Sequence, residues 1–172
     1  SGDALAELRA RLNRAIALMS SDRRDEARTM LASVLADGES QGQLRAVCFA
    51  LANLSIIALW KHEYADALAL SERSIIFARR LGDKILLAHL ITNLAELRLF
   101  FGLVTEAEQA LAFGRKACGA LVISKLASHF ALAAARIHLA RGRTLEATAE
   151  IKTALGTSET SPAGGHLGHA QG

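Results

Sequence analysis

One residue pattern recurs every forty residues along this chain, and this recurrence constrains the fold more than any other feature. Its clearest column is an alanine that follows an acidic residue. The four pairs are Glu26–Ala27, Asp66–Ala67, Glu106–Ala107 and Glu146–Ala147. Two further columns hold small or slim residues, namely Ala15, Ser55, Ala95 and Ala135, and Val34, Ser74, Gly114 and Ala154. Matched columns at a fixed period indicate an array of four similar structural units.

Each unit has the residues expected of two helices joined by a turn. Small residues on facing helices let two backbones approach closely. The acidic column falls in the first turn of each second helix, where the helix dipole favours negative charge by about 0.3–1 kcal/mol. The turn within each unit holds Asp22, His62, Gly102 or Gly142, and the breaks between units hold Gly38 with Gly42, then Gly82 and Gly119. We therefore expect helices at residues 3–20, 24–37, 43–61, 64–81, 84–101, 104–118, 122–141 and 144–156.

The composition favours an all-α fold. Aromatic residues make up 5% of the chain, so alanine and leucine carry much of its 51% hydrophobic content. The single proline, Pro162, follows the last expected helix and interrupts none. We expect one helical repeat domain at residues 1–156, followed by a disordered Gly/Ser-rich tail at 157–172. The units of the domain are expected at about 3–42, 43–82, 83–121 and 122–156.

Charge and hydropathy argue against two classes of partner. The longest uncharged run, residues 46–60, is shorter than the roughly 20 residues of a membrane span, so we expect a buried helix and no membrane partner. The net charge of +3 is small, and the basic stretches at 23–28 and 141–143 are short, so no nucleic-acid partner is expected. Cys48 and Cys118 are isolated, which fits a reducing, cytoplasmic setting.

Catalytic and metal-binding motifs are not evident. The chain has no Gly-rich phosphate loop, nucleophile elbow or paired catalytic carboxylates. His89 and His129 share one column, but packed helices of adjacent units lie about 10 Å apart. Because Zn–N bonds are only about 2.0–2.1 Å long, we expect this spacing to be too large for one zinc ion. The sequence therefore predicts a non-enzyme without metal or cofactor.

The order of small residue, turn, acidic residue and alanine resembles the tetratricopeptide repeat. It is most evident in NLAELRLFFGLVTEAEQAL (93–111) and AAARIHLARGRTLEATAEI (133–151), and the resemblance covers residues 3–156. The unit is forty residues rather than about 34, and the closing proline is absent. Longer units of this kind resemble those of kinesin light chains and of bacterial regulators with helical sensor domains. HEAT repeats share the period but usually carry a proline in the first helix, which this chain lacks.

The resemblance implies a right-handed α-solenoid of four antiparallel helical hairpins, a tetratricopeptide-like superhelix whose first helices line a concave groove. Residues spaced 4, 3 and 4 apart share one helix face. The expected groove residues on this face are Asn13, Phe49, Asn53, Ile56, Trp60, His89, Asn93, Glu96 and Phe100. The resemblance further implies that the asparagines hold a peptide backbone, since an amide offers both a donor and an acceptor. Aromatic neighbours would supply apolar pockets.

Other interpretations of these residues remain open. The asparagines could instead bond the backbone of a neighbouring helix, and Trp60 or Phe100 could belong to the core or to a dimer contact. The leading hypothesis is a module that binds a peptide or partner domain, as part of a larger bacterial signalling or transcription-regulating protein. The alternatives are a self-association module forming a homodimer, since solenoids expose apolar ends unless capped, and a small-molecule sensor.

Overall fold

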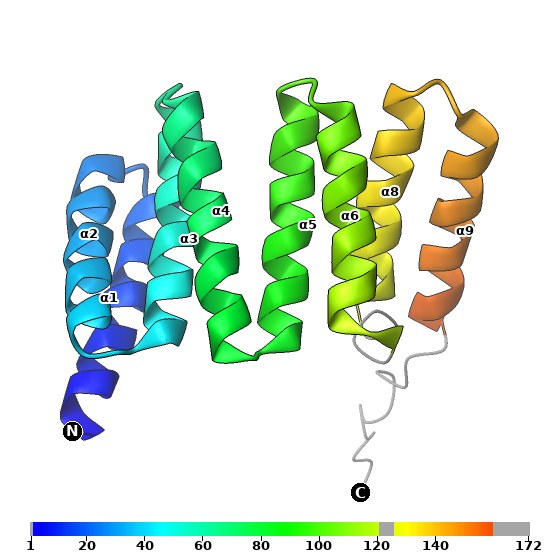
Figure 1. Ribbon diagram of the computed structural model, residues 1–172. Helices are drawn as coiled ribbons and strands as arrows, with labels where there is room; N and C mark the ends of the chain where they lie inside the picture. Colours follow the sequence, from blue (N-terminus) through cyan, green and yellow to red (C-terminus); the bar gives the residue numbers. More distant parts are fainter. Residues whose placement is uncertain (1, 121–125, 160–172) are drawn as a thin grey trace, which may run out of the picture.

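The computed structural model describes residues 2–120 and 126–159, and within these ranges the chain forms eight helices. They are α1 (Gly2–Ser20), α2 (Arg24–Ser40), α3 (Leu44–Trp60), α4 (Tyr64–Leu81), α5 (Lys84–Phe100), α6 (Val104–Cys118), α8 (Ala127–Ala140) and α9 (Thr144–Glu159). Successive pairs form antiparallel hairpins that stand side by side in chain order (Figure 1). This arrangement confirms the all-α array of four hairpins that the repeat predicts.

Three helix boundaries differ from the predicted ones by more than one residue. Helix α2 continues to Ser40, so Gly38 lies inside the helix and does not help to break it. Gly38 is buried in the contact between α2 and α3. The two helices approach so closely here that a Cβ on residue 38 would lie 3.1 Å from Cγ2 of Val47. Helix α8 begins at Ala127, later than predicted, and residues 121–125 lie outside the described part. Helix α9 continues to Glu159, so residues 157–159, which were predicted to belong to the disordered tail, are helical. The rest of the predicted tail, 160–172, lies outside the described residues.

The turn within each hairpin has one backbone conformation in all four units. Asp22, His62, Gly102 and Gly142 have φ angles of 60°, 62°, 75° and 74°. This left-handed region costs most residues about 1–2 kcal/mol relative to glycine. Two of the units therefore use glycine and two use a polar residue at the same position. The predicted turns are confirmed, and the shared φ explains why this column stays in register.

The small-residue columns set how closely the helices approach. Ala15, Ala95 and Ala135 are buried, and Ser55 at the same column donates from its Oγ to the carbonyl of Ala67, 2.7 Å away, which joins α3 to α4. The closest fit is at Gly114 of α6. A Cβ there would lie 2.9 Å from Cγ2 of Ile91 and 3.1 Å from Cε1 of Phe130. This glycine lets α6 approach both α5 and α8.

The apolar run at residues 46–60 forms the buried part of α3. Val47, Leu51 and Ile57 are fully buried, because α3 packs against the helices on both sides of it. Such burial accounts for the near-continuous hydrophobic sequence of this helix. In the described part of the chain, no helix combines the length and the apolar character that a membrane span requires.

Candidate functional site

Helices α1, α3, α5 and α8 line a groove built from three adjoining cavities. The first, of ≈ 520 Å³, lies between α1 and α3, and the second, of ≈ 670 Å³, extends from α3 to α5. The third, of ≈ 500 Å³, lies among α3, α4, α5 and α8. Phe49 lines the first two cavities, and Asn93 lines the last two. The cavities therefore form one continuous surface, called the concave groove below.

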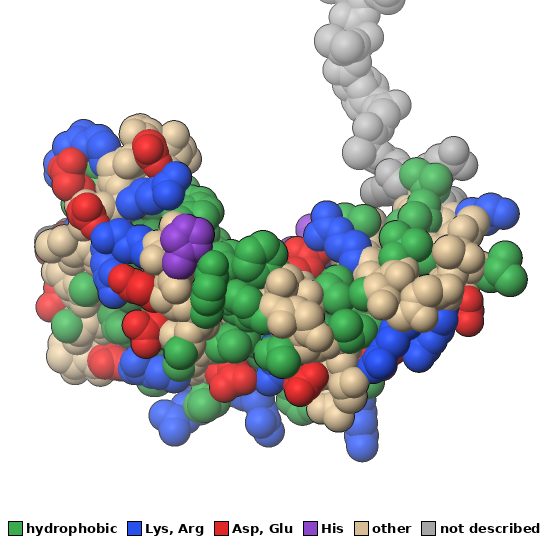
Figure 2. Space-filling model, turned by 90° about the horizontal axis from the view of Figure 1, so that it is seen from above, with side chains coloured by type: hydrophobic (Ala, Val, Ile, Leu, Met, Phe, Trp, Pro, Cys, Tyr) green, Lys and Arg blue, Asp and Glu red, His purple; other side chains and the backbone are tan. Residues whose placement is uncertain are grey.

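The concave groove is open and its floor is largely apolar. Seen from the end that carries the turns within the hairpins, the molecule is hollowed between its two halves, with hydrophobic side chains gathered in the hollow (Figure 2). The exposed large hydrophobic residues that line the groove are Leu5, Ile16, Phe49, Ile56, Ile85 and Phe100. An exposed apolar surface of this extent, interrupted by polar groups, is typical of an interaction site.

The structure brings together eight of the nine predicted groove residues. Those that line the three cavities are Asn13, Phe49, Asn53, Ile56, His89, Asn93, Glu96 and Phe100. Trp60 lines none of these cavities. Its ring lies under the guanidinium of Arg24 of α2, at 4.8 Å from the ring centroid.

The asparagines have side-chain atoms available for a ligand. Nδ2 of Asn53 donates to the carbonyl of Phe49 in its own helix, 2.8 Å away, which leaves Oδ1 as an acceptor. Asn13 and Asn93 are exposed, and neither side chain has a hydrogen bond to the described part of the chain. The alternative in which these residues bond a neighbouring helix is thus not found among the described residues. An amide oxygen at Asn53 and a complete amide at Asn93 can face a bound backbone.

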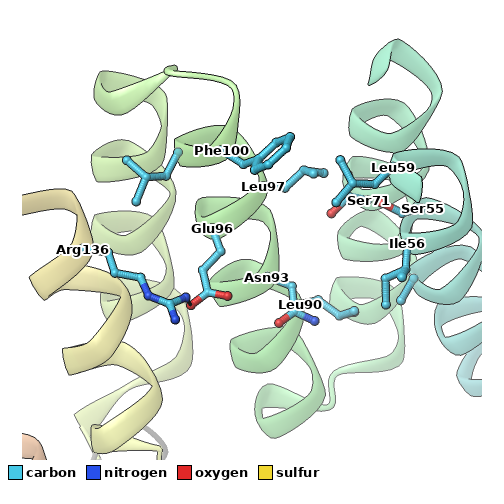
Figure 3. Close-up of a pocket in the computed structure, with 12 residues that line it drawn as sticks. Ser55, Ile56, Leu59, Ser71, Leu90, Asn93, Glu96, Leu97, Phe100 and Arg136 are labelled. Atoms are coloured by element: carbon cyan, nitrogen blue, oxygen red, sulfur yellow. Dashed lines mark hydrogen bonds and ion pairs between the residues drawn. The ribbon is translucent and has the colours of Figure 1, made fainter. Parts of the chain in front are cut away.

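The third cavity lies where α4 has a serine in place of the leucine of units 1 and 3. Ser71 of α4 matches Leu31 and Leu111, and both leucines are buried against the first helix of the next unit. The smaller serine leaves space between α4 and α5. Figure 3 shows Leu90, Leu97 and Phe100 of α5 on one side of this space, and Ile56 and Leu59 of α3 on the other. Sequence reasoning missed Ser71, although a serine in a column that otherwise holds leucine or isoleucine is a visible signal.

Charged groups on the groove wall are mostly paired. The Glu96 carboxylate accepts from Nη1 of Arg136 at 2.7 Å, across the junction of α5 and α8 (Figure 3). Arg45 pairs with Asp83, which also caps α5 by accepting from the backbone N–H of Leu86 at 2.9 Å. The Leu86 amide and the Arg45 guanidinium lower the pKa of Asp83. The positive charge of Arg136 offsets that of Glu96, so this part of the groove wall has a smaller net negative charge than Glu96 alone would give it.

His89 and His129 are closer than the sequence predicted. Their ring centroids lie 5.2 Å apart with an interplanar angle of 87°, so the expectation that unit spacing keeps them apart is wrong. The distance of about 10 Å between packed helix axes does not limit side chains that lean toward each other. Burial, and then the neighbouring His129, lower the pKa of His89. Among the described residues no three metal-ligating side chains come together.

The fold resembles two solved structures of tetratricopeptide-like repeats. BtubC (BKLC) from P. vanneervenii matches with a TM-score of 0.70 and 18% identity over 92% of this chain and 65% of its own length. A Podosopora anserina protein, described as a kinesin light chain with nearly identical TPR-like repeats, matches with a TM-score of 0.64 and 17% identity over 91% of this chain and 77% of its own. The chain matches no protein-family model and no curated protein. Its fold is thus a tetratricopeptide-like right-handed α-solenoid.

Proposed function

We propose that this chain is a protein–protein interaction module and that its concave groove binds an extended peptide or an extended segment of a partner domain. The tetratricopeptide-like fold generally mediates protein–protein interaction. The observation that carries the proposal is the continuity of the three cavities, which runs from α1 to α8 and includes the side chains of the three asparagines. A surface of this length suits a chain segment better than a compact ligand.

Binding divides between backbone and side-chain contacts. Oδ1 of Asn53 accepts a peptide N–H, and the Asn93 amide pairs with both an N–H and a carbonyl of the bound segment. Each such hydrogen bond contributes about 0.5–1.5 kcal/mol net. Apolar side chains of the partner then enter the cavities beside Phe49 and Phe100, which are exposed in the free protein. The asparagines thus fix the path of the bound chain and the cavities select its sequence.

A peptide selection tests this proposal directly. Peptides are selected from a phage-displayed library on the purified wild-type chain, and their dissociation constants are measured by fluorescence anisotropy. We expect the Asn53→Ala/Asn93→Ala double variant to raise these constants by about 10- to 100-fold, since two or three hydrogen bonds are lost. Gln109→Ala on α6, which lies outside the three groove cavities, is the control and leaves them unchanged. Equal affinity for all three proteins contradicts the proposal.

The module acts by equilibrium recognition and not by catalysis, as the interaction part of a larger bacterial signalling or transcription-regulating protein in the cytoplasm. This part of the proposal is supported by the long, forty-residue unit, which resembles the repeats of such regulators. A two-hybrid assay in a bacterial host, using the selected peptides as fusions, tests whether recognition occurs in the cytoplasm. Loss of the signal in the asparagine double variant is the expected result.

The third cavity supports a second candidate function, a small-molecule sensor. Its volume of ≈ 500 Å³ is in the range of small-molecule sites, and its walls are mainly apolar with Asn93 and the Glu96–Arg136 pair at the edge. A metabolite bound between units 2 and 3 would change how α5 packs on α4. Thermal stabilisation by a metabolite, abolished in Ser71→Leu and unaccompanied by any peptide binding, would favour this candidate over the first.

A further inference from the structure

Two histidine side chains meet where units 3 and 4 join. His89 of α5 and His129 of α8 have ring centroids 5.2 Å apart and ring planes at 87°. His89 is half-buried and His129 is exposed, and neither imidazole has a hydrogen bond to the described part of the chain. Both rings therefore keep polar nitrogens available for a ligand.

The separation of these rings is that of two imidazoles bound to one metal ion. Zn–N bonds are about 2.0–2.1 Å long and a ring nitrogen lies about 1 Å from its ring centre, so two imidazoles on a tetrahedral ion have centroids about 5 Å apart. The 5.2 Å between His89 and His129 matches this distance. It also lies in the range of an edge-to-face ring contact, about 4.5–7 Å. The ring nitrogens without hydrogen-bond partners favour the metal-binding alternative.

The charges around the pair do not oppose a cation. The charged side chains that line the second cavity with His89 are Arg45 and Asp83, and they pair with each other. Two helical turns further along α5 and α8, Arg136 is likewise paired with Glu96, at 2.7 Å. Burial lowers the pKa of His89, so its imidazole is neutral at pH 7 and does not have to lose a proton before it binds an ion.

Asn93 offers a polar group one helical turn from His89. It lies four residues further on, on the same face of α5, and both residues line the second cavity. Its amide has no hydrogen bond to the described part of the chain, so it can hold a metal-bound water. Among the described residues no third histidine, cysteine or carboxylate joins the pair. Water, or a group of a partner in the concave groove, would therefore fill the other positions of the ion.

We propose that His89 and His129 together bind one divalent metal ion of the Zn²⁺, Ni²⁺ and Cu²⁺ group, and that the open positions of this ion face the concave groove. Imidazole nitrogen suits these ions, whereas Ca²⁺ and Mg²⁺ prefer oxygen ligands. The ion joins α5 to α8, and a histidine or carboxylate of a bound partner can complete its coordination. Metal binding by this pair does not depend on whether the groove binds a peptide.

Isothermal titration calorimetry with ZnCl₂ and no peptide tests the site. All proteins carry His166→Gln/His169→Gln, so that the histidines beyond the described residues do not contribute. We expect one Zn²⁺ per chain, and we expect His89→Gln or His129→Gln to raise the dissociation constant at least about tenfold. His62→Asn, in the turn of unit 2, is the control and leaves it unchanged, since asparagine tolerates the left-handed φ of 62°.

A double variant distinguishes one shared ion from two separate histidine sites. If both rings hold the same ion, losing either ring removes the chelate, so His89→Gln/His129→Gln weakens binding little more than each single change. Two separate sites would instead give two ions per chain, of which each single variant loses one. Electron paramagnetic resonance with Cu²⁺ is a second measurement. It should show coupling to two imidazole nitrogens in the wild type and to one in each single variant.

Four results would overturn the proposal. They are a wild-type chain that binds no Zn²⁺, unchanged affinity in either single variant, two ions per chain, and an equal loss in His62→Asn. Circular dichroism confirms that each variant is folded. Peptide affinity is measured separately in buffer with EDTA. Peptide binding without a Zn²⁺ site would leave the proposed function standing, and a Zn²⁺ site without peptide binding would leave this proposal standing.

Discussion

The guanidinium of Arg24 lies over the indole ring of Trp60, 4.8 Å from the ring centroid. Arg24 begins α2 and Trp60 ends α3, so this contact joins unit 1 to unit 2. A cation–π contact of this kind contributes about 0.5–1 kcal/mol at an exposed site. Trp60 thus has a structural partner within the protein, whereas the other aromatic residues predicted for the groove line its cavities.

Replacing Trp60 should therefore affect stability more than peptide binding. We expect Trp60→Ala to lower the free energy of unfolding by about 1–3 kcal/mol, below the value for a fully buried tryptophan. Arg24→Ala should lower it by about 0.5–1 kcal/mol. Urea denaturation of both variants measures these changes, and anisotropy measures peptide affinity. A loss of affinity at unchanged stability would instead place Trp60 in the binding site.

The turn column predicts a graded response to substitution at Gly102. Its φ of 75° is left-handed, and a Cβ at this position would have open space around it, so the cost is conformational alone. We expect Gly102→Ala to lower the free energy of unfolding by about 1 kcal/mol, Gly102→Val to lower it further, and Gly102→Asn to cost least. Thermal melts rank the three variants. Equal costs for Asn and Val would show that φ does not decide the response.

Filling the third cavity should separate stability from binding. Leucine at position 71 would restore the residue of units 1 and 3 and pack against Leu90 and Leu97. We expect Ser71→Leu to raise the free energy of unfolding by about 1 kcal/mol and to weaken selected peptides at least about tenfold. The control, Ser74→Leu, lies at a fully buried position without a cavity and should destabilise the fold by about 1–3 kcal/mol. Unchanged peptide affinity in Ser71→Leu would remove the third cavity from the binding site.

The histidine pair predicts a pH dependence of stability. Burial and the adjacent His129 lower the pKa of His89 in the folded state. Between this lowered pKa and the unfolded value of about 6.5, the unfolded chain binds more protons than the folded chain. Stability is therefore full above about pH 6.5 and falls as the pH drops through the folded pKa. His89→Gln should flatten this part of the profile in urea titrations, whereas an unchanged profile would exclude His89 as its source.

The repeat made most of the fold predictable. Each column is fixed by a local requirement: Ala107 by close packing, Gly102 by a left-handed turn and Glu106 by the helix dipole. Each requirement recurs once in every forty-residue unit, so the sequence repeat reveals it without coordinates. The same period placed Asn53 and Asn93 on one face, and the structure puts both in the concave groove.

Features that depend on contacts between units were harder to predict. Trp60 has the spacing of a groove residue, but its environment is set by Arg24 of the neighbouring unit. The approach of His89 to His129 depends on side-chain direction and not on the separation of helix axes. Gly38 looked like a helix end because glycine often has that role, whereas here it allows the close approach of Val47. In each case the deciding partner lies on another helix.

The most direct test of groove binding is a two-dimensional NMR titration with selective ¹⁵N labelling of asparagine. The chain has three asparagines, Asn13, Asn53 and Asn93, so three side-chain amide pairs report on three positions along the groove. On addition of a selected peptide, we predict that the Asn53 and Asn93 amide signals shift or broaden in a saturable manner. A peptide that binds the protein while all three pairs remain unchanged would contradict the account, because its site would lie outside the concave groove.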